Sequence, residues 1–203
     1  MNIEVQQASL EDKTILRNLM ELYAYDFSEF DHGDVDAHGL FGYSRLDHYW
    51  TEPGRYPFIV RVESKLAGLV LVRTLDDSNT SITRSIAEFF ILKKYRHQGI
   101  GRVAVQRIFD MFPGQWSVAQ VENNHPAQAF WRKVISEYTQ GDFQEIWLNN
   151  EEWKGPSRNL AQGQTYFKNQ KTAPNRRIQP TPTRAPFDER YLAWSSSQLG
   201  GIP

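Results

Sequence analysis

One stretch of the sequence combines an apolar strand pattern, a glycine turn and a helical pattern, and this combination suits phosphate binding. Residues 86–92 are apolar except for one acid, and Arg96-x-x-Gly99-x-Gly101 follows them. From Val105 to Phe112, apolar residues recur at spacings of three and four, which predicts a helix. The first turn of a helix has unpaired, partly positive N–H groups, which glycines leave uncovered. A phosphate group could bind there, although glycines used only for a tight connection would give the same pattern.

Two other kinds of phosphate-binding loop fit this stretch less well. A P-loop ends in Gly-Lys-Ser/Thr, whereas Arg102 and Val103 follow Gly101 here. A dinucleotide fingerprint has a third Gly or Ala, the position of Ala104, and an acid about twenty residues further on, where Glu122 stands. The loop alone therefore does not exclude a dinucleotide as the ligand.

A second pattern begins at Asn124 and predicts another helix. Asn124 suits the N-cap, and Pro126 suits the first turn because its missing N–H would be unpaired there. Ala127, Phe130 and Trp131 then share one helical face.

Together, the two patterns resemble the GNAT superfamily of N-acetyltransferases. Its members carry (Arg/Gln)-x-x-Gly-x-(Gly/Ala) as a pyrophosphate loop, followed by an Asn-x-x-Ala-x-x-aromatic-Tyr segment at a similar distance. The resemblance covers roughly residues 3–150. It implies an α+β fold, a mixed, mainly antiparallel sheet flanked by helices, in a domain that we place at residues 1–159. It also implies transfer of an acetyl group from acetyl-CoA to a primary amine of a small molecule or peptide.

The resemblance assigns residues to acetyl-CoA as cosubstrate. The backbone amides of Phe89, Phe90 and Ile91 are expected to serve the pantetheine arm and the thioester carbonyl. Asn124 matches the position that contacts the arm of the cosubstrate, and no metal ion is expected. The pyrophosphate is expected to lie on the loop formed by His97, Gln98, Gly99, Ile100, Gly101 and Arg102.

Acetyl transfer also requires a base, because an alkyl amine with a pKa near ~10.4 is mostly protonated at neutral pH. Glu88 is the predicted catalytic base: it is an acid within an apolar strand, and several GNAT enzymes use a glutamate on this strand. Burial would raise its pKa. The alternative is a Glu88 that faces solvent; His97 and His125 are weaker candidates for the base.

One residue departs from the family pattern. Many GNAT enzymes have a tyrosine that protonates the leaving thiolate, and Trp131 stands at that position. An indole N–H only donates hydrogen bonds, so water, Tyr138 or Tyr43 would supply the proton, or no acid is used. This departure keeps open a catalytically weak module of the same fold that senses acetyl-CoA or binds a partner.

The segment from Tyr23 to Trp50 mixes aromatic residues with acids and has little periodicity, which predicts a long functional loop. By resemblance it lines the acceptor site, with Asp26, Glu29 and Tyr43 as substrate-binding residues. Its six acids favour a cationic amine over an anionic amino acid. Alternatively, the segment is a flap whose acids face water.

The remaining elements follow from hydrophobic periodicity. A first strand is predicted at Ile3–Val5, a helix from Ser9 to Tyr23, and a hairpin at residues 58–62 and 66–72. Residues 116–121 are predicted to form the strand after the glycine-loop helix. Residues 137–148 are predicted to form the closing strands, the last at 143–148.

Composition changes near Leu160. Residues 160–203 contain five of the ten prolines and six basic residues against two acids. We expect a basic, proline-rich tail of low order, either an inert extension or a segment that touches a partner or nucleic acid.

Composition excludes several classes of protein. The absence of cysteine excludes disulfides, zinc–thiolate sites and cysteine nucleophiles, and a net charge of −1 gives no global attraction to nucleic acid, which is not an expected partner. The first residues do not resemble a signal peptide, and no apolar run is long enough to cross a membrane. The expected location is the cytoplasm; the sequence does not indicate an oligomeric state.

Overall fold

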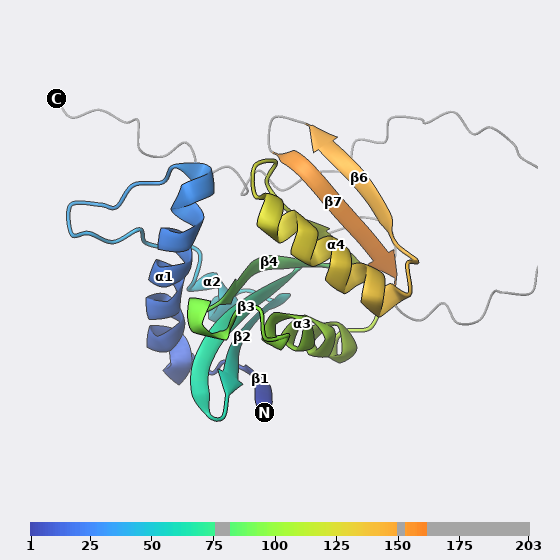
Figure 1. Cartoon of the computed structure of the whole chain (residues 1–203). Helices are drawn as coiled ribbons and strands as arrows, with labels where there is room; N and C mark the ends of the chain where they lie inside the picture. The colour runs from blue at the N-terminus through green and yellow to red at the C-terminus, as the bar shows by residue number, and fades with distance from the viewer. Residues whose placement is uncertain (76–81, 150–152, 162–203) are drawn as a thin grey trace, which may run out of the picture.

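The computed structural model describes residues 1–75, 82–149 and 153–161, and these residues form one sheet flanked by helices (Figure 1). The strand order is β1-β2-β3-β4-β5-β7-β6. The strands are β1 (Ile3–Gln7), β2 (Arg55–Val62), β3 (Lys65–Leu75), β4 (Thr83–Ile91), β5 (Gln115–Ala119), β6 (Gln144–Asn149) and β7 (Lys154–Ala161). The helices are α1 (Lys13–Asp31), α2 (His48–Thr51), α3 (Ile100–Met111) and α4 (His125–Thr139). The predicted mixed, mainly antiparallel sheet is confirmed.

The β4–β5 pair is parallel, whereas the other strand pairs are antiparallel. A parallel pair needs a crossover, and α3 provides it. Registered pairing covers just Thr83–Ser85 against Gln115–Ser117. Beyond these residues β4 and β5 are no longer paired, which leaves an opening in the middle of the sheet.

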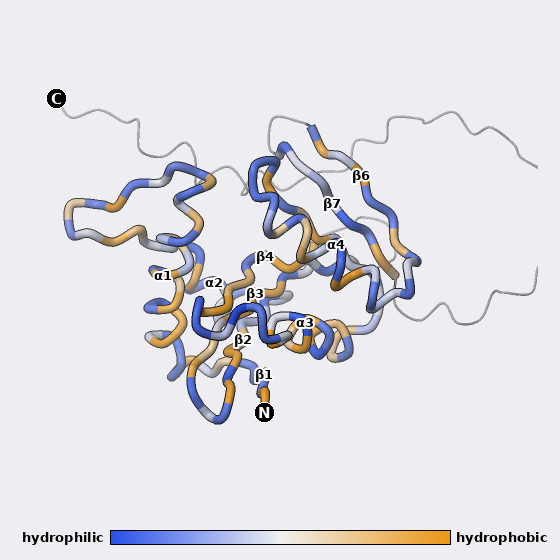
Figure 2. The backbone as a smooth tube through the Cα atoms, viewed as in Figure 1, coloured by the Kyte–Doolittle hydropathy of each residue, from blue (hydrophilic) through white to orange (hydrophobic). Residues whose placement is uncertain are grey.

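Each face of the sheet packs against different helices. On one face, Val70 and Val72 of β3 belong to a buried cluster with Ile108 of α3 and Val134 of α4. On the other face, Leu69 and Leu71 of β3 pack with buried side chains of α1 and α2, namely Leu16, Leu19, Met20 and Tyr49. Figure 2 shows hydrophilic and hydrophobic residues alternating around α1 and α3, as expected for helices with one buried face.

Helix α1 is longer than predicted, because Tyr23–Asp31 is helical rather than part of a loop. Tyr23, Phe27 and Phe30 stand at helical spacing, and consecutive rings contact each other with centroids 5.5 and 6.0 Å apart. The interleaved acids concealed this period in the sequence. The predicted acceptor loop is thus reduced to the connection after α1.

The predicted closing strands were partly wrong. Residues 137–139 continue α4, and β6 is followed by β7, which lies between β5 and β6. The sequence analysis did not identify β7, which contains Gly155 and Pro156, residue types that are rare inside strands.

Strand β7 also extends two residues past the predicted domain end at residue 159. Leu160, assigned to the tail, is 4% exposed and pairs with Trp116 of β5. Residues 162–203 of the predicted tail lie outside the described residues. In the described part of the chain, no helix is long and apolar enough to cross a membrane.

Candidate active site

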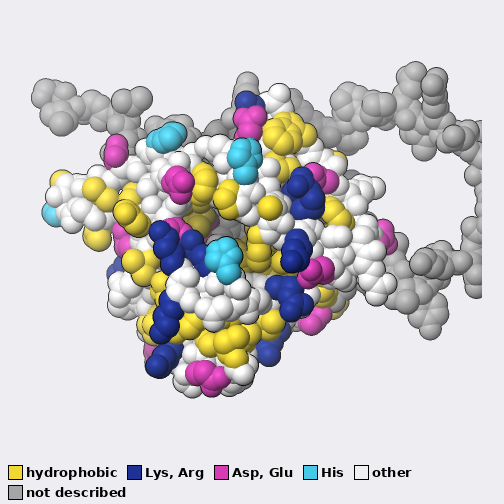
Figure 3. All heavy atoms as spheres, in the orientation of Figure 1, with side chains coloured by type: hydrophobic (Ala, Val, Ile, Leu, Met, Phe, Trp, Pro, Cys, Tyr) yellow, Lys and Arg dark blue, Asp and Glu magenta, His cyan; other side chains and the backbone are white. Residues whose placement is uncertain are grey.

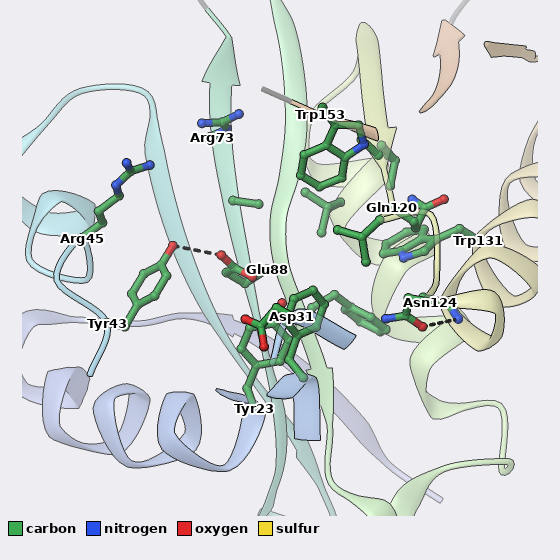
Figure 4. A pocket seen from close by; sticks show the side chains of 18 of the residues that line it. Tyr23, Asp31, Tyr43, Arg45, Arg73, Glu88, Gln120, Asn124, Trp131 and Trp153 are labelled. Atoms are coloured by element: carbon green, nitrogen blue, oxygen red, sulfur yellow. Dashed lines mark hydrogen bonds between the residues drawn. The ribbon is translucent and has the colours of Figure 1, made fainter. Parts of the chain in front are cut away.

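A cavity of about 620 Å³ lies where β4 and β5 diverge (Figure 4). Its walls come from the C-terminal half of α1, the 43–55 segment, β3, β4, β5 and its following loop, the start of α4, and residues 153–154. Among the lining side chains are Tyr23, Tyr43, Arg73, Glu88, Asn124 and Trp131.

A β-bulge in β4 sets the direction of Glu88. Leu71 pairs with Glu88 and Val72 pairs with Ile86, so Ala87 is an extra residue in β4. In a regular strand, Ile86 and Glu88 would point to the same face. The extra residue instead puts Ile86 in the α3–α4 cluster and sets Glu88 opposite Leu71, whose side chain packs on the α1 face. The predicted base is therefore directed into the cavity.

Glu88 is a buried carboxylic acid whose pKa is shifted toward neutral pH. Burial raises its pKa to about 7, although hydrogen bonds from Tyr23 and Tyr43 and the positive charges of Arg73 and Arg45 act in the opposite direction. The Tyr43 hydroxyl donates to Glu88 Oε1 over 3.1 Å. Burial and the neighbouring Glu88 charge also raise the pKa of Tyr43, so its hydroxyl stays protonated at neutral pH.

The predicted glycine loop begins helix α3. Gly99 is the N-cap residue with φ +78°, and a Cβ there would have nothing within 4 Å. The N–H of Val103 donates to the carbonyl oxygen of Gly99, which is the first hydrogen bond of the helix. The N–H groups of Ile100, Gly101 and Arg102 come before it and have no acceptor within the helix. A helix N-terminus with an open glycine cap is suited to an anion.

Gly101 has a different role from Gly99. Its φ is not positive, but a Cβ there would lie 3.3 Å from the Phe130 and Phe89 rings. These two rings stack with centroids 5.4 Å apart, and Trp131 packs edge-on against both. The small residue therefore lets α3 approach the aromatic side chains of β4 and α4.

Residues 16–135 match the model of the acetyltransferase (GNAT) family. The chain belongs to the GNAT acetyltransferase family. A search of curated proteins found no relative of significant sequence similarity.

Solved structures show the same fold at low sequence identity. An acetyltransferase from Thermus thermophilus has a TM-score of 0.59 at 14% identity, over 79% of this chain and 97% of that chain. The PaiA N-acetyltransferase from Thermoplasma acidophilum, in complex with coenzyme A, has a TM-score of 0.57 at 11% identity, over 80% and 100%. An aminoglycoside acetyltransferase from an uncultured soil metagenomic sample has a TM-score of 0.54 at 15% identity, over 73% and 95%.

The other residues that the sequence assigns to the cosubstrate of this GNAT protein lie on β4 and at the start of α3. Phe89 lines the cavity, whereas the Phe90 and Ile91 side chains are buried in clusters on opposite faces of the sheet. Beyond Ser85, β4 is paired with β3 alone, so the backbone amides on its other edge face the opening. His97, Gln98 and Arg102 are exposed at the start of α3.

Asn124 lines the cavity and also caps α4. Its side-chain oxygen accepts a hydrogen bond from the Ala127 N–H over 3.0 Å, as expected from the sequence. Its side-chain amide group remains on the cavity wall (Figure 4).

The two acids predicted to bind the acceptor, Asp26 and Glu29, do not line the cavity. Asp26 forms ion pairs with Arg96 and with Lys93, whose Nζ is 3.1 Å from Asp26 Oδ1. Burial tends to raise the pKa of Asp26, but the hydrogen bonds from these two cations outweigh it and lower the pKa. Glu29 is exposed, and neither Asp26 nor Glu29 is among the residues that line the cavity. Of the six acids in the predicted loop, Asp31 lines it.

The candidate proton donors are also separated by the structure. The Tyr138 hydroxyl donates to Asp110 Oδ1 over 2.8 Å, and Tyr138 does not line the cavity. His97 and His125, the weaker candidates for the base, do not line it either. Tyr43 remains beside Glu88. Trp131 is 5% exposed and packs against Phe89, which explains an indole at this position by packing.

Sequence reasoning missed three cavity-lining arginines, Arg45, Arg55 and Arg73. They come from the segment before α2, from β2 and from β3. The available signal was the position of Arg73 two residues after a buried leucine, which puts a cation on the buried face of a strand. Among the described residues, no group of three or more His, Asp and Glu could hold a metal ion.

Proposed function

We propose that this protein transfers the acetyl group of acetyl-CoA to a primary amine of a small molecule or peptide. The observation that carries the proposal is a carboxylic acid with a pKa of about 7, directed by a β-bulge into the cavity between β4 and β5. A carboxylate tuned to neutral pH is suited to take a proton from an ammonium group.

The start of α3 fits the pyrophosphate of acetyl-CoA. The open αL cap at Gly99 and the first-turn amides of Ile100, Gly101 and Arg102 would hold it. Lys and Arg side chains gather on both sides of this helix start in Figure 3, which favours an anionic ligand. The unpaired edge of β4 and Asn124 would hold the pantetheine arm. When bound, acetyl-CoA supplies an acetyl group activated as a thioester.

Glu88 would act in the reaction by removing a proton from the bound amine, directly or through water. An alkyl ammonium has a pKa near ~10.4 in water, and burial of the amine lowers that value toward the pKa of Glu88. Tyr43 keeps Glu88 oriented and remains protonated itself.

Protonation of the leaving thiolate does not require an acid on α4. Trp131 cannot supply the proton, and the Tyr138 hydroxyl is bound to Asp110. A thiolate with a pKa near ~8.5 is a tolerable leaving group without such help. The tryptophan is therefore compatible with turnover.

The sensor alternative explains less of the site. A binding module has no need for an acid that burial destabilises, whereas a base does. For the acceptor, an aminoglycoside acetyltransferase and Arabidopsis thaliana Naa50, in complex with the bisubstrate analogue CoA-Ac-MVNAL (TM-score 0.50), are examples of a small-molecule and a peptide acceptor among similar folds.

We also propose that residues 1–161 form the catalytic domain, since β7 completes the sheet. A thiol-release assay with acetyl-CoA and a panel of primary amines tests the function. Release that requires an amine and falls about 100-fold or more in Glu88→Gln supports it. Coenzyme A binding without release for any amine would favour the sensor instead.

A further inference from the structure

Arginine side chains are placed side by side on the face of the sheet that carries Glu88. Arg73 of β3 is two residues beyond Leu71, the partner of Glu88, so it emerges on the same face about 7 Å along the strand. Arg55 of β2 is the registered partner of Arg73. Like charges directly opposite each other on neighbouring strands destabilise a sheet, so this pair concentrates positive charge at one point of the sheet.

A third arginine approaches from outside the sheet. Arg45 belongs to the segment before α2 and, like Arg55 and Arg73, lines the cavity. In Figure 4, Arg45 and Arg73 lie on either side of the space above Tyr43 and Glu88. Both positive charges act on Glu88 and lower its pKa, which places them within electrostatic range of its carboxylate.

Of the acids among the described residues that line the cavity, Glu122 and Asp31 already have other partners. Lys154 lies 2.6 Å from Glu122, and Asp31 Oδ1 accepts the N–H of Gly33. Arg55 is compensated by Glu52, with 3.0 Å between Nε and Oε2. Arg45 forms no ion pair with any described residue. Among the described residues, Glu88 is an acid on which the charges of Arg45 and Arg73 act, and with a pKa of about 7 it is partly protonated at neutral pH.

We propose that the acceptor is a carboxylate-bearing amine of amino-acid type, whose amine lies at Glu88 and whose carboxylate is bound by Arg73 and Arg45. This inference rests on the proposed function. Guanidinium groups bind carboxylates with two parallel hydrogen bonds, and such charge-assisted contacts are the strong ones in a partly buried site.

The same arrangement disfavours the cationic acceptor that the sequence suggested. Asp26 is paired with Arg96 and Lys93, and Asp47 with Lys13, so these acids do not provide a negative wall. A polyamine or aminoglycoside would bring further positive charges next to Arg45 and Arg73. Two arginines beside the base therefore select for a substrate with one amine and one anionic group.

The test compares matched acceptors that differ in the carboxylate. The twenty common L-amino acids, β-alanine and 4-aminobutyrate are assayed by thiol release beside their carboxamides, with spermidine as a cationic acceptor. The variants are Arg73→Gln and Arg45→Gln, with Arg61→Gln on β2 as a matched control outside the cavity. The measured quantity is the ratio of kcat/KM for each acid to that for its amide, so the intrinsic difference in amine reactivity cancels between wild type and variants.

We expect at least one acid to be preferred over its amide, and this ratio to fall about 10- to 100-fold in Arg73→Gln and Arg45→Gln, with partial recovery in Arg73→Lys. Arg61→Gln should keep the wild-type ratio. Thermal unfolding of each variant identifies loss of folding. Amides or spermidine used as well as the acids, or a ratio insensitive to both substitutions, would overturn the inference.

Calorimetric binding of the same compounds separates this inference from the proposed function. Arg73-dependent binding of an acid without any thiol release supports the anion site and rejects acetyl transfer. Thiol release with amines that lack a carboxylate, together with no binding of any of the acids, supports acetyl transfer and rejects the anion site. Absence of binding and turnover for every acid counts against the anion site as well.

Discussion

The hydroxyl of Tyr43 donates a hydrogen bond to Glu88 over 3.1 Å, joining the segment before α2 to the bulged strand β4. Three influences set the pKa of Glu88: burial raises it, hydrogen bonds and neighbouring arginines lower it, and the net result is a rise from 4.5 to about 7. A change in any one of them should alter both the pH dependence of activity and the pH dependence of stability.

The first prediction concerns the pH profile of the wild-type protein. Because the ionised form of Glu88 is the base, kcat/KM for amine acetylation should rise with pH through a limb centred near pH 7. Glu88→Gln should remove this limb and lower kcat/KM by about 100-fold or more. A thiol-release assay between pH 5.5 and 9 measures both. A Glu88→Gln variant that keeps the limb would assign it to another group.

The second prediction concerns the hydrogen bond from Tyr43. The bond stabilises the ionised form of Glu88, so Tyr43→Phe should raise the pKa of Glu88 and move the limb to higher pH. One hydrogen bond of about 1 kcal/mol corresponds to a shift of about 0.7 pH units. Tyr25→Phe, at a side chain that is 68% exposed, is the control and should leave the profile in place. A limb that moves downward in Tyr43→Phe would contradict this account.

The third prediction concerns stability. The folded state raises the pKa of Glu88 from 4.5 to about 7, so its contribution to stability is fully present below pH 4.5 and is lost as pH rises through 7. Glu88→Gln should therefore gain stability relative to wild type between pH 5 and pH 8, by about 1–3 kcal/mol. Urea unfolding at both pH values measures the difference. An equal difference at the two pH values would mean that the carboxylate is solvated.

Local sequence pattern predicted the elements that carry the candidate site residues. Glu88 lies within the apolar run that forms β4, and Gly99 and Asn124 are the N-cap residues of α3 and α4, so hydrophobic periodicity and capping residues were enough to locate them. The direction of Glu88 was not predictable, because it depends on an extra residue in the pairing of β4 with β3.

Long-range pairing accounts for the residues that the sequence misassigned or missed. Asp26 looked like an acceptor acid, but its partner Arg96 is 70 residues away. Arg55 and Arg73 become neighbours through the register of β2 with β3, and Arg45 reaches the same cavity from a connecting segment. Nothing in their local sequence links these arginines to Glu88.

The fourth prediction concerns the end of the domain. Leu160 is 4% exposed in the α3–α4 cluster, so Leu160→Ala should destabilise the protein by about 2–4 kcal/mol. Leu40→Ala, at a side chain that is 49% exposed, should change stability by less than about 0.5 kcal/mol. A chain ending at residue 161 keeps β7 and should unfold within a few degrees of the full chain. A larger drop for that truncation would show that residues beyond 161 contribute to the domain.

The fifth prediction separates the two glycines of the loop. Gly99→Val forces a β-branched residue to φ +78° and puts side-chain bulk over the first-turn amides, so coenzyme A affinity should fall at least tenfold. Gly101→Val should weaken binding by displacing the Phe130 and Phe89 rings, and it should also lower stability. Gly39→Val is the matched control, because φ is +76° and a Cβ would have nothing within 4 Å there too. It should carry a similar backbone strain of about 1–2 kcal/mol without loss of affinity. Calorimetric titration with coenzyme A measures the affinity of each variant. Equal affinities for Gly99→Val and Gly39→Val would mean that the pyrophosphate does not bind at the start of α3.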